Sequence, residues 1–545
     1  MGAGGGSPRR RGGTAAGLFG VALLVVGTVL APGGAYAQPL APPGGHSAGP
    51  GGDEGHDGPG GHDGRKGDHG KGGAKPGSDE APGAAPTRRA APPAASGPAV
   101  PTAPATGGSD APGARPAPAP GAVLAAVDGA GAAVPTAQGL QQALAAVRAD
   151  RNLGDLTFAV ADAATGQLLY GAGENTPATP ASTTKLATAI AALSLIPGET
   201  RLHTRVVRGT DPGTIVLVGG GDPTLTALPA DQVQIGGQPA DADTAPASLD
   251  ALAQQTADAL KGAGTTTVQL DYDLSLYAGS PQHRNHDAQN IALVVPLMVD
   301  EGRVDPKSRD DAPDRVADPA AAAAEAFAAL LKARGITVTG AKPAATPAPA
   351  PAASGQVPLG DVFSPTVARL VERLLTTSDN QLAEAIARQV AVVAHQPASF
   401  EGAAAAVTQE LARLGVPMTG VVLNDGSGLH TGNEIPPAVL VRLLALAASE
   451  QHPTLRPVLT GLPVAGFTGT LNRRYGSGSG AADAAGLIRA KTGTLSGVNT
   501  LAGTVVDADG RLLAFAVMTR TTAPADAARA AMDRIAARLT TCGCH

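Results

Sequence analysis

A serine and a lysine at the start of an apolar helix constrain this chain more than any other feature. Ser182 and Lys185 stand three residues apart. An apolar stripe follows them at helical spacings and consists of Leu186, Ile190 and Leu193. A helix that begins here places the serine and the lysine on one face. Because burial lowers the pKa of a lysine, its amine can accept the proton of a neighbouring hydroxyl. The pattern therefore predicts a serine nucleophile with a lysine base, beside the free N–H groups of a helix N-terminus.

A Ser-x-x-Lys pair is also typical of a capping serine with a solvated lysine, so two further motifs are needed to decide. Lys185 is the single lysine, among nine, that has a serine three residues before it. Ser378-Asp379-Asn380 is the only Ser-x-Asn in the chain, and Lys491-Thr492-Gly493 is the only Lys-Thr-Gly. Ser378 could instead cap the helix that follows it. Together, however, the three motifs stand in the order used by penicillin-binding proteins and serine β-lactamases.

The first 137 residues are expected to lie outside any folded domain. Residues 1–37 combine a positive segment at 9–11, an apolar run at 15–30 and a small-x-small cleavage site at 35–37, which is typical of a signal peptide. An uncleaved membrane anchor is the alternative. Residues 38–137 are rich in Gly, Pro, Ala, Asp and His, which predicts a disordered linker. The histidines of this linker lack a rigid frame, so no metal site is assigned to them. We therefore expect an extracytoplasmic protein that meets the membrane only during export.

Helix and strand patterns divide the rest of the chain into two regions. Residues 138–205 and 358–545 are predicted to form an α/β catalytic domain with an antiparallel sheet and a helical subdomain, and residues 206–357 an inserted, smaller α/β accessory region. Helices are expected at 138–149, after Ser182, at 319–332, from Pro365 with Ser364 as cap, from Gln381, at 400–414 and at 525–539. Strands are expected at 156–160, 167–170, 214–218, 265–270, 291–295, 336–339, 421–423, 487–490, 501–505 and 512–518.

Composition excludes several classes of function. The net charge is −6 with acids and bases mixed, which leaves no electrostatic footprint for nucleic acid. The glycines at 219–221 follow a strand but lack the Lys-Ser/Thr of a phosphate loop. Cys542 and Cys544 are too few for a zinc site, and a disulfide between them closes a very tight ring, so they receive no function. Asp425, in an Asp-Gly-Ser-Gly turn, is expected to have a structural role.

With the three motifs in place, the sequence resembles the S13 peptidase family. These are D-alanyl-D-alanine carboxypeptidases and endopeptidases, the class C low-molecular-mass penicillin-binding proteins. The resemblance covers roughly residues 138–540 and includes three stretches outside the motifs, at 217–223, 425–429 and 462–466. The separation of 196 residues between the two motif serines also resembles this family, whose members insert extra domains at that point.

The resemblance implies a role for each residue of the first two motifs. Ser182 would attack the carbonyl between two D-alanines of a peptidoglycan stem peptide, and Lys185 would accept its proton. Ser378 would relay a proton to the leaving amine, and Asn380 would donate a hydrogen bond to the substrate amide.

The same resemblance implies that the third motif binds substrate. Lys491 would face the terminal carboxylate, Thr492 would add a hydroxyl donor, and Gly493 and Thr494 would complete the wall. The oxyanion would lie between the backbone N–H groups of Ser182 and Thr494. No metal or cofactor is needed, and β-lactams would act as covalent inhibitors. Two alternatives stay open at this point: a β-lactamase, which needs a deacylating base that the sequence does not offer, and a non-catalytic wall-binding or penicillin-sensing protein.

Overall fold

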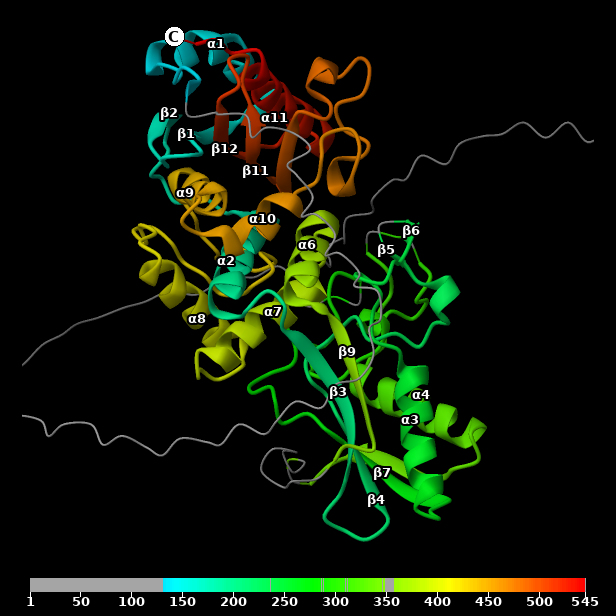
Figure 1. Ribbon diagram of the computed structural model, residues 1–545. Coiled ribbons are helices and arrows are strands. Elements are labelled where there is room, and N and C mark those ends of the chain that lie inside the picture. Colours follow the sequence, from blue (N-terminus) through cyan, green and yellow to red (C-terminus); the bar gives the residue numbers. More distant parts are fainter. Residues whose placement is uncertain are drawn as a thin grey trace, which may run out of the picture. The chain divides into compact units, whose positions relative to one another are not determined.

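The computed structural model describes residues 131–544, apart from residues 236, 286, 288, 309, 311, 346 and 348–356 (Figure 1). The predicted signal peptide and most of the predicted linker therefore lie outside the described residues. Within the described part, none of the helices has both the length and the hydropathy of a membrane-spanning segment.

One five-stranded sheet joins segments from both ends of the described chain. Its order is β10-β11-β12-β1-β2 and every pair is antiparallel. The strands are β1 (Asp155–Asp162), β2 (Leu168–Ala172), β10 (Ile488–Leu495), β11 (Val498–Val506) and β12 (Leu512–Arg520). The hairpin β1–β2 thus extends the meander β10–β12, which is consistent with the predicted fold class of a mixed α/β domain with an antiparallel sheet.

The two faces of this sheet carry side chains of different size. Helices α1 (Ala137–Arg148) and α11 (Ala525–Thr540) cover one face, and α9 (Pro437–Ala448) packs on the other (Figure 1). In β12, Phe515 and Val517 join the core beneath α1 and α11, whereas Ala514 and Ala516 join the core on the other side. The alternation follows the period of two of a strand. Small alanines on one face let helices approach closely in a chain with only 2% aromatic residues.

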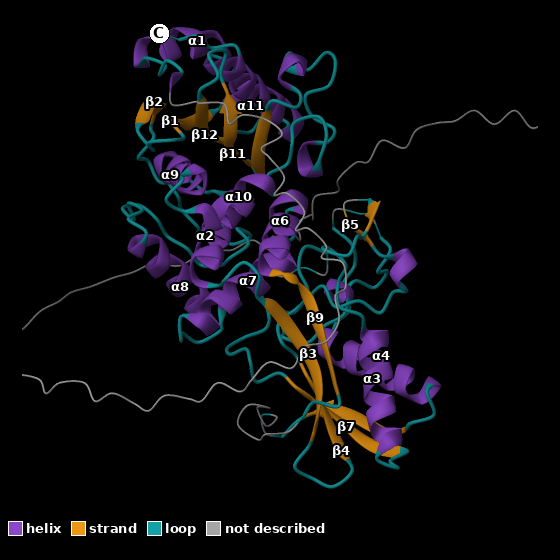
Figure 2. Cartoon of the chain, in the orientation of Figure 1, coloured by secondary structure: helices purple, strands orange, loops and turns teal. Residues whose placement is uncertain are grey.

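Helix α2 (Lys185–Leu195) follows the predicted nucleophile, and other helices surround it. Those not yet introduced are α6 (Val367–Thr377), α7 (Asn380–Val393), α8 (Phe400–Arg413) and α10 (Arg456–Thr460) (Figure 2). The sequence predicts a single apolar stripe on α2, but every residue from Lys185 to Leu193 is buried. Alanines and Thr188 fill the remaining faces, so α6, α7, α8 and α9 can all pack against this helix.

A second sheet combines strands of the predicted inserted region with strands that flank it in the sequence. Its order is β8-β7-β4-β3-β9, with parallel pairs β4–β7 and β7–β8 and antiparallel pairs at β3. The strands are β3 (Arg201–Arg208), β4 (Thr214–Val218), β7 (Thr267–Asp273), β8 (Thr337–Pro343) and β9 (Gly360–Thr366), and the helices that cover them are α3 (Leu249–Gly262) and α4 (Pro319–Ala333). A small hairpin joins β5 (Gln234–Ile235) to β6 (Gln238–Pro239). This sheet reaches beyond the expected limits of 206 and 357, and the division into domains stays a prediction.

Short 3-10 helices connect these elements. They are η2 (Arg151–Leu153), η3 (Ala181–Thr184), η4 (Ala230–Gln232), η5 (Asp300–Gly302), η6 (Pro453–Leu455), η7 (Gly469–Leu471) and η8 (Ala482–Ala484).

Three local predictions are wrong. Residues 291–295 form no strand, and the N–H of Ala292 instead binds the side chain of Gln381. Residues 421–423 contribute only one isolated bridge. Ser364 and Pro365 do not start a helix but lie in β9, and α6 begins at Val367 with Thr366 as its cap. In the last case, pairing of β9 with β3 overrides a favourable local capping signal.

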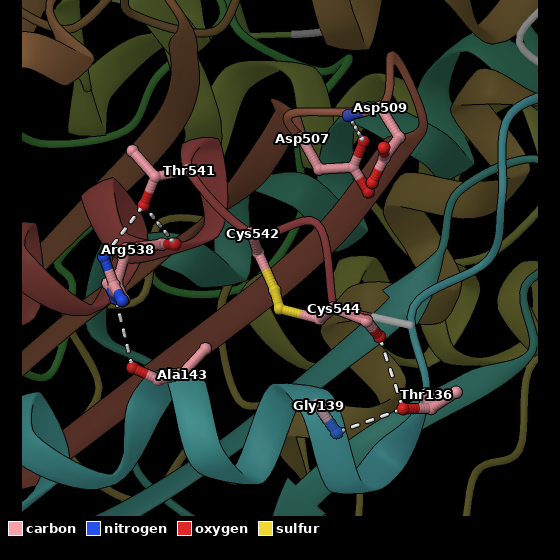
Figure 3. Close-up of a disulfide and its surroundings, with 9 residues drawn as sticks. All are labelled: Thr136, Gly139, Ala143, Asp507, Asp509, Arg538, Thr541, Cys542 and Cys544. Carbon is pink, nitrogen blue, oxygen red and sulfur yellow. Dashed lines mark hydrogen bonds between the residues drawn. A yellow bond between two sulfur atoms is a disulfide. The ribbon is translucent and has the colours of Figure 1, made fainter.

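The two cysteines fasten the end of the chain to the start of α1. Cys542 and Cys544 form a disulfide that is buried in the core beneath α1 (Figure 3). The carbonyl of Cys544 accepts a hydrogen bond from the Thr136 N–H at 2.6 Å. The close approach also requires Gly139, because a Cβ there would lie 2.5 Å from that carbonyl oxygen. The tight ring that the sequence left without a role therefore shapes the contact between the two ends of the domain.

Candidate active site

The turn that carries Ser182 lies between the five-stranded sheet and the glycine-rich loop formed by residues 425–428. Ser182 lies in η3, and α2 follows directly. The Thr500 hydroxyl of β11 donates to the Pro180 carbonyl at 2.8 Å. Two glycines allow the close approach of neighbouring backbone: a Cβ at Gly493 would lie 2.9 Å from the Ser182 nitrogen, and one at Gly428 would lie 1.9 Å from the Ala181 carbonyl oxygen. The predicted nucleophile therefore lies on a turn that strand β10 and the loop approach closely at two glycines, where a side chain would clash with the backbone of the turn.

The lysine of the first motif contacts the predicted nucleophile. Lys185 Nζ lies 2.9 Å from Ser182 Oγ, 2.7 Å from Asn380 Oδ1 and 2.6 Å from the Ser427 carbonyl oxygen. A neutral lysine amine has two N–H donors and one lone pair. Because Asn380 and Ser427 accept the two N–H groups, the lone pair is left for the Ser182 hydroxyl. This geometry suits proton transfer from serine to lysine.

Burial lowers the pKa of Lys185, as its predicted role as a base requires. Its side chain is fully buried, and desolvation lowers its pKa to about 8. The negative charges of Asp425, Glu384 and Asp379 oppose this shift because they favour the ammonium form. A base whose pKa lies this close to neutral pH combines a useful fraction of free amine with useful proton affinity.

The second motif lies between two helices. Ser378 follows α6 in the left-handed conformation, with φ 61°, and its hydroxyl accepts a hydrogen bond from Lys491 Nζ at 2.7 Å. The alternative in which Ser378 caps the next helix is wrong, because the Asp379 carboxylate caps α7 by accepting from the Leu382 N–H at 3.0 Å. The Ser378 hydroxyl is thus directed to the third motif.

Glu301, which lies in the predicted accessory region, forms a hydrogen bond with Asp379 of the second motif. Burial opposes ionisation of Asp379, but a hydrogen bond with Glu301 and the charges of Arg315, Arg303 and Arg373 lower its pKa to about 2. Burial and the charge of Asp379 raise the pKa of Glu301, whereas its ion pairs with Arg303 and Arg373 oppose this shift. Sequence patterns gave no indication of this contact, since Glu301 lies far from the motifs in the chain.

The third motif lies within a strand. The prediction that Lys491 follows a strand is wrong: β10 includes it, and its side chain is fully buried. Desolvation, and next the charge of Lys185, hold the pKa of Lys491 well below its usual range. The Thr492 hydroxyl lies 2.8 Å from the Thr470 hydroxyl, and the Thr494 hydroxyl accepts from Arg529 at 3.3 Å. The structure thus brings the predicted residues of all three motifs together, and their roles stay predictions.

One buried group of the described residues has the composition of a metal site. The possible ligand atoms of His283, Glu384 and Asp425 lie within 4.8 Å of one another. These atoms already have protein partners: His283 Nε2 lies 2.9 Å from Asp425 Oδ2, and Glu384 accepts the N–H groups of Gly426 and Ser427. The arrangement fits a hydrogen-bonded support for the loop, in line with the structural role expected of Asp425.

Comparisons with known proteins agree with the geometry of the site. Residues 140–314 and 310–539 match the model of the D-Ala-D-Ala carboxypeptidase 3 (S13) family. A carboxypeptidase of Mycobacterium tuberculosis is 36% identical over 423 residues, which cover 76% of this chain and 86% of the relative. Carboxypeptidase DacB of Mycolicibacterium smegmatis is 35% identical over 419 residues, with the same coverage. In fold, the chain is similar to the crystal structure of penicillin-binding protein 4 from Haemophilus influenzae, with a TM-score of 0.57 and 20% identity over 74% of this chain and 98% of that one.

Proposed function

The chain belongs to the S13 family of D-Ala-D-Ala carboxypeptidases, serine peptidases that act on peptidoglycan and are inhibited by β-lactams, and from this premise we propose a role for each residue of its site. Ser182 is the nucleophile and Lys185 the base. The observation that carries this assignment is the 2.9 Å contact between Lys185 Nζ and Ser182 Oγ, with the other two contacts of the amine taken by acceptors.

Acylation begins when the Lys185 amine takes the proton of the Ser182 hydroxyl. The serine oxygen attacks the carbonyl carbon between the two D-alanines, and the backbone N–H groups of Ser182 and Thr494 hold the oxyanion. The C–N bond then breaks as the Ser378 hydroxyl gives its proton to the leaving amine and takes in return the proton that Lys185 had removed from Ser182, so D-alanine departs and Lys185 is a free amine again. Water then attacks the ester on Ser182, and its proton returns to the Ser182 oxygen, which restores the serine hydroxyl.

Recognition of the terminal carboxylate falls to the third motif. Lys491 is a buried cation-forming group with no carboxylate among the causes of its pKa shift. The carboxylate of a bound substrate would supply the negative charge that Lys491 lacks in the protein, and the Thr492 hydroxyl would donate a second hydrogen bond to it. Asn380 lies with its Oδ1 on Lys185 and its Nδ2 3.2 Å from the Asn290 carbonyl, so that Nδ2 is held at the site for the substrate amide.

The family acts on the cell wall, which implies an extracytoplasmic protein. We further propose that residues 1–37 are a cleaved signal peptide and that residues 38–137 form a linker that gives the enzyme reach through the wall. Residues 206–357 are proposed as an accessory region carried by the catalytic domain.

Benzylpenicillin tests the proposed function in one experiment. Its ring carbonyl imitates that of D-Ala-D-Ala, and its amine stays tethered after ring opening, which hinders the approach of water. Intact mass spectrometry should show one added equivalent on the Ser182 peptide that lasts for many minutes, while a stem peptide in its place releases D-alanine. Rapid turnover of penicillin would instead identify a β-lactamase, and a stable adduct without peptide cleavage would identify a sensor.

A further inference from the structure

A buried glutamate lies behind the base and has no place in the mechanism above. Glu384 is on α7, four residues after Asn380, and its side chain is fully buried. Its Oε1 accepts the Ser427 N–H at 2.8 Å and the Gly426 N–H at 3.2 Å, and its Oε2 lies 3.1 Å from the same Gly426 nitrogen. One carboxylate therefore holds two consecutive peptide groups of the Asp-Gly-Ser-Gly loop.

A second buried carboxylate holds the other side of this loop. Asp425 accepts from the Gly428 N–H at 2.9 Å, the His430 N–H at 2.7 Å and the Asn433 amide at 2.6 Å. His283 Nε2 lies 2.9 Å from Asp425 Oδ2, the oxygen that also accepts the His430 N–H. The Gly428 N–H belongs to the same peptide group as the Ser427 carbonyl, and the Ser427 N–H belongs to the peptide group before it, so Asp425 and Glu384 hold the two peptide groups on either side of the Ser427 Cα.

The Ser427 carbonyl is one of the two acceptors that orient the Lys185 amine. A backbone carbonyl can hold an N–H donor in a fixed direction only as well as its own peptide plane is held. If the peptide plane of the Ser427 carbonyl turns, the N–H group of Lys185 that donates to this carbonyl turns with it. The lone pair of the Lys185 amine then no longer points at the Ser182 hydroxyl. Small errors of geometry at a reacting pair cost much of the rate.

We propose that Glu384 is a positioning residue for the reaction: by holding the peptide groups of Gly426 and Ser427, it orients the Lys185 amine toward Ser182. This proposal rests on the proposed function, since it concerns the same proton transfer. Glu384 acts through the loop and touches neither the substrate nor the reacting atoms.

The charges around the base predict a second effect of Glu384. Asp425, Glu384 and Asp379 all favour the ammonium form of Lys185. Burial, and next the charge of Asp425, raise the pKa of Glu384, whereas the charge of His283 lowers it. Loss of Glu384 removes a negative charge and loosens the Ser427 acceptor, so the pKa of Lys185 falls further. A smaller folded fraction would lower the rate without moving the pKa of Lys185 in the molecules that remain folded.

The test compares two substitutions with a matched control. Glu384→Gln keeps one oxygen acceptor but turns an amide toward the Gly426 N–H, whereas Glu384→Leu removes both acceptors. Glu410→Leu changes a buried glutamate of α8, which binds Arg413 and Ser194 near the far end of α2. Melting temperatures establish how far each variant remains folded.

The readout is the rate of acylation by benzylpenicillin as a function of pH. We expect the rate on the high-pH plateau to fall about three- to ten-fold in Glu384→Gln and about ten- to a hundred-fold in Glu384→Leu. In both variants, the part of the pH–rate profile that rises with pH should move to lower pH. Glu410→Leu should change neither. If Glu384→Leu does not fold, Glu384→Gln decides alone.

A plateau rate within twofold of the unmodified enzyme overturns the proposal. A lower plateau rate with no shift of the profile along the pH axis also overturns the proposal, because a general loss of structure would then explain the slower reaction. Failure of the unmodified enzyme to be acylated is a different result, since it would contradict the proposed function itself.

Discussion

The two buried lysines of the site differ in the charges that surround them. Both side chains are fully buried, and desolvation lowers the pKa of each. Lys185 has three carboxylates that partly offset this shift, whereas the one charge acting on Lys491 is that of Lys185, which lowers its pKa further. Chemically identical groups are therefore set for different tasks by their neighbours.

The difference shows where each lysine finds a negatively charged partner. Lys185 has its counter-charges built into the protein, so its proton affinity stays near neutral pH, as a base requires. Among the residues that the structure describes, the partners of Lys491 are the Ser378 hydroxyl and the carbonyl of its neighbour Thr492. Its missing counter-charge is one that a substrate carboxylate can bring. The following predictions test this contrast, from the largest expected effect to the smallest.

Removal of the base should have the largest effect. Lys185→Ala should slow acylation of Ser182 by a fluorescent penicillin by about 10²–10⁴-fold, because the hydroxyl loses its proton acceptor. Circular dichroism and the melting temperature check that the fold remains. Near-normal labelling of a folded variant would mean that another residue is the base.

The pH dependence should follow Lys185. Since the free amine accepts the proton and its pKa is about 8, acylation should rise with pH and level off above that value. Between pH 8 and pH 6 the rate should fall about fifty-fold, as the amine becomes protonated. Stopped-flow measurement with benzylpenicillin, alongside melting curves at each pH, provides the check. A flat rate across this window would contradict the assignment.

Substitution of the second lysine should depend on the substrate. Lys491→Ala should slow the reaction with a peptide that ends in D-Ala-D-Ala by about ten- to a hundred-fold, since a charge-assisted contact contributes about 1.5–3 kcal/mol. The same peptide with an amidated end serves as control and should lose much less. Equal losses in kcat/KM on both peptides would remove Lys491 from carboxylate recognition.

The smallest effect is expected beside Lys491, where the partners are neutral. Thr470→Val removes the hydroxyl that lies 2.8 Å from that of Thr492. A neutral hydrogen bond contributes about 0.5–1.5 kcal/mol, so kcat/KM on the carboxylate peptide should fall about two- to ten-fold. Thr470→Ser should restore the rate, and a serine variant as slow as the valine one would point to packing instead.

The sequence predicts which motif residues lie close together, because the proposed chemistry requires particular side chains. A serine, a lysine and an amide at these spacings have few other reasons to occur together, and the structure brings Ser182, Lys185 and Asn380 within contact. Ser427 could not be found in this way, since it acts through its backbone carbonyl, which every residue has. A buried glutamate such as Glu384 resembles an ordinary helix residue until α7 is packed against the loop.

Errors in the fold have the same origin. Ser364 and Pro365 carry a strong local signal for a helix start, but pairing with a distant strand places them in β9. The expected strand at 291–295 instead supplies backbone groups to α7, including the N–H that binds Gln381. Local preference fails where a contact across the chain determines the backbone.

The pairing of β1 with β12 also bears on when the enzyme becomes active. Asp155 is paired with Arg520, so the sheet cannot close until nearly the whole chain is available. Contacts of such long sequence separation form slowly. Strand β10, which carries Lys491, belongs to the same late meander, whereas Ser182 and Lys185 come early in the chain. An emerging polypeptide therefore contains Ser182 and Lys185 long before it contains Lys491, and we expect peptidase activity to begin only when the late strands have joined the sheet.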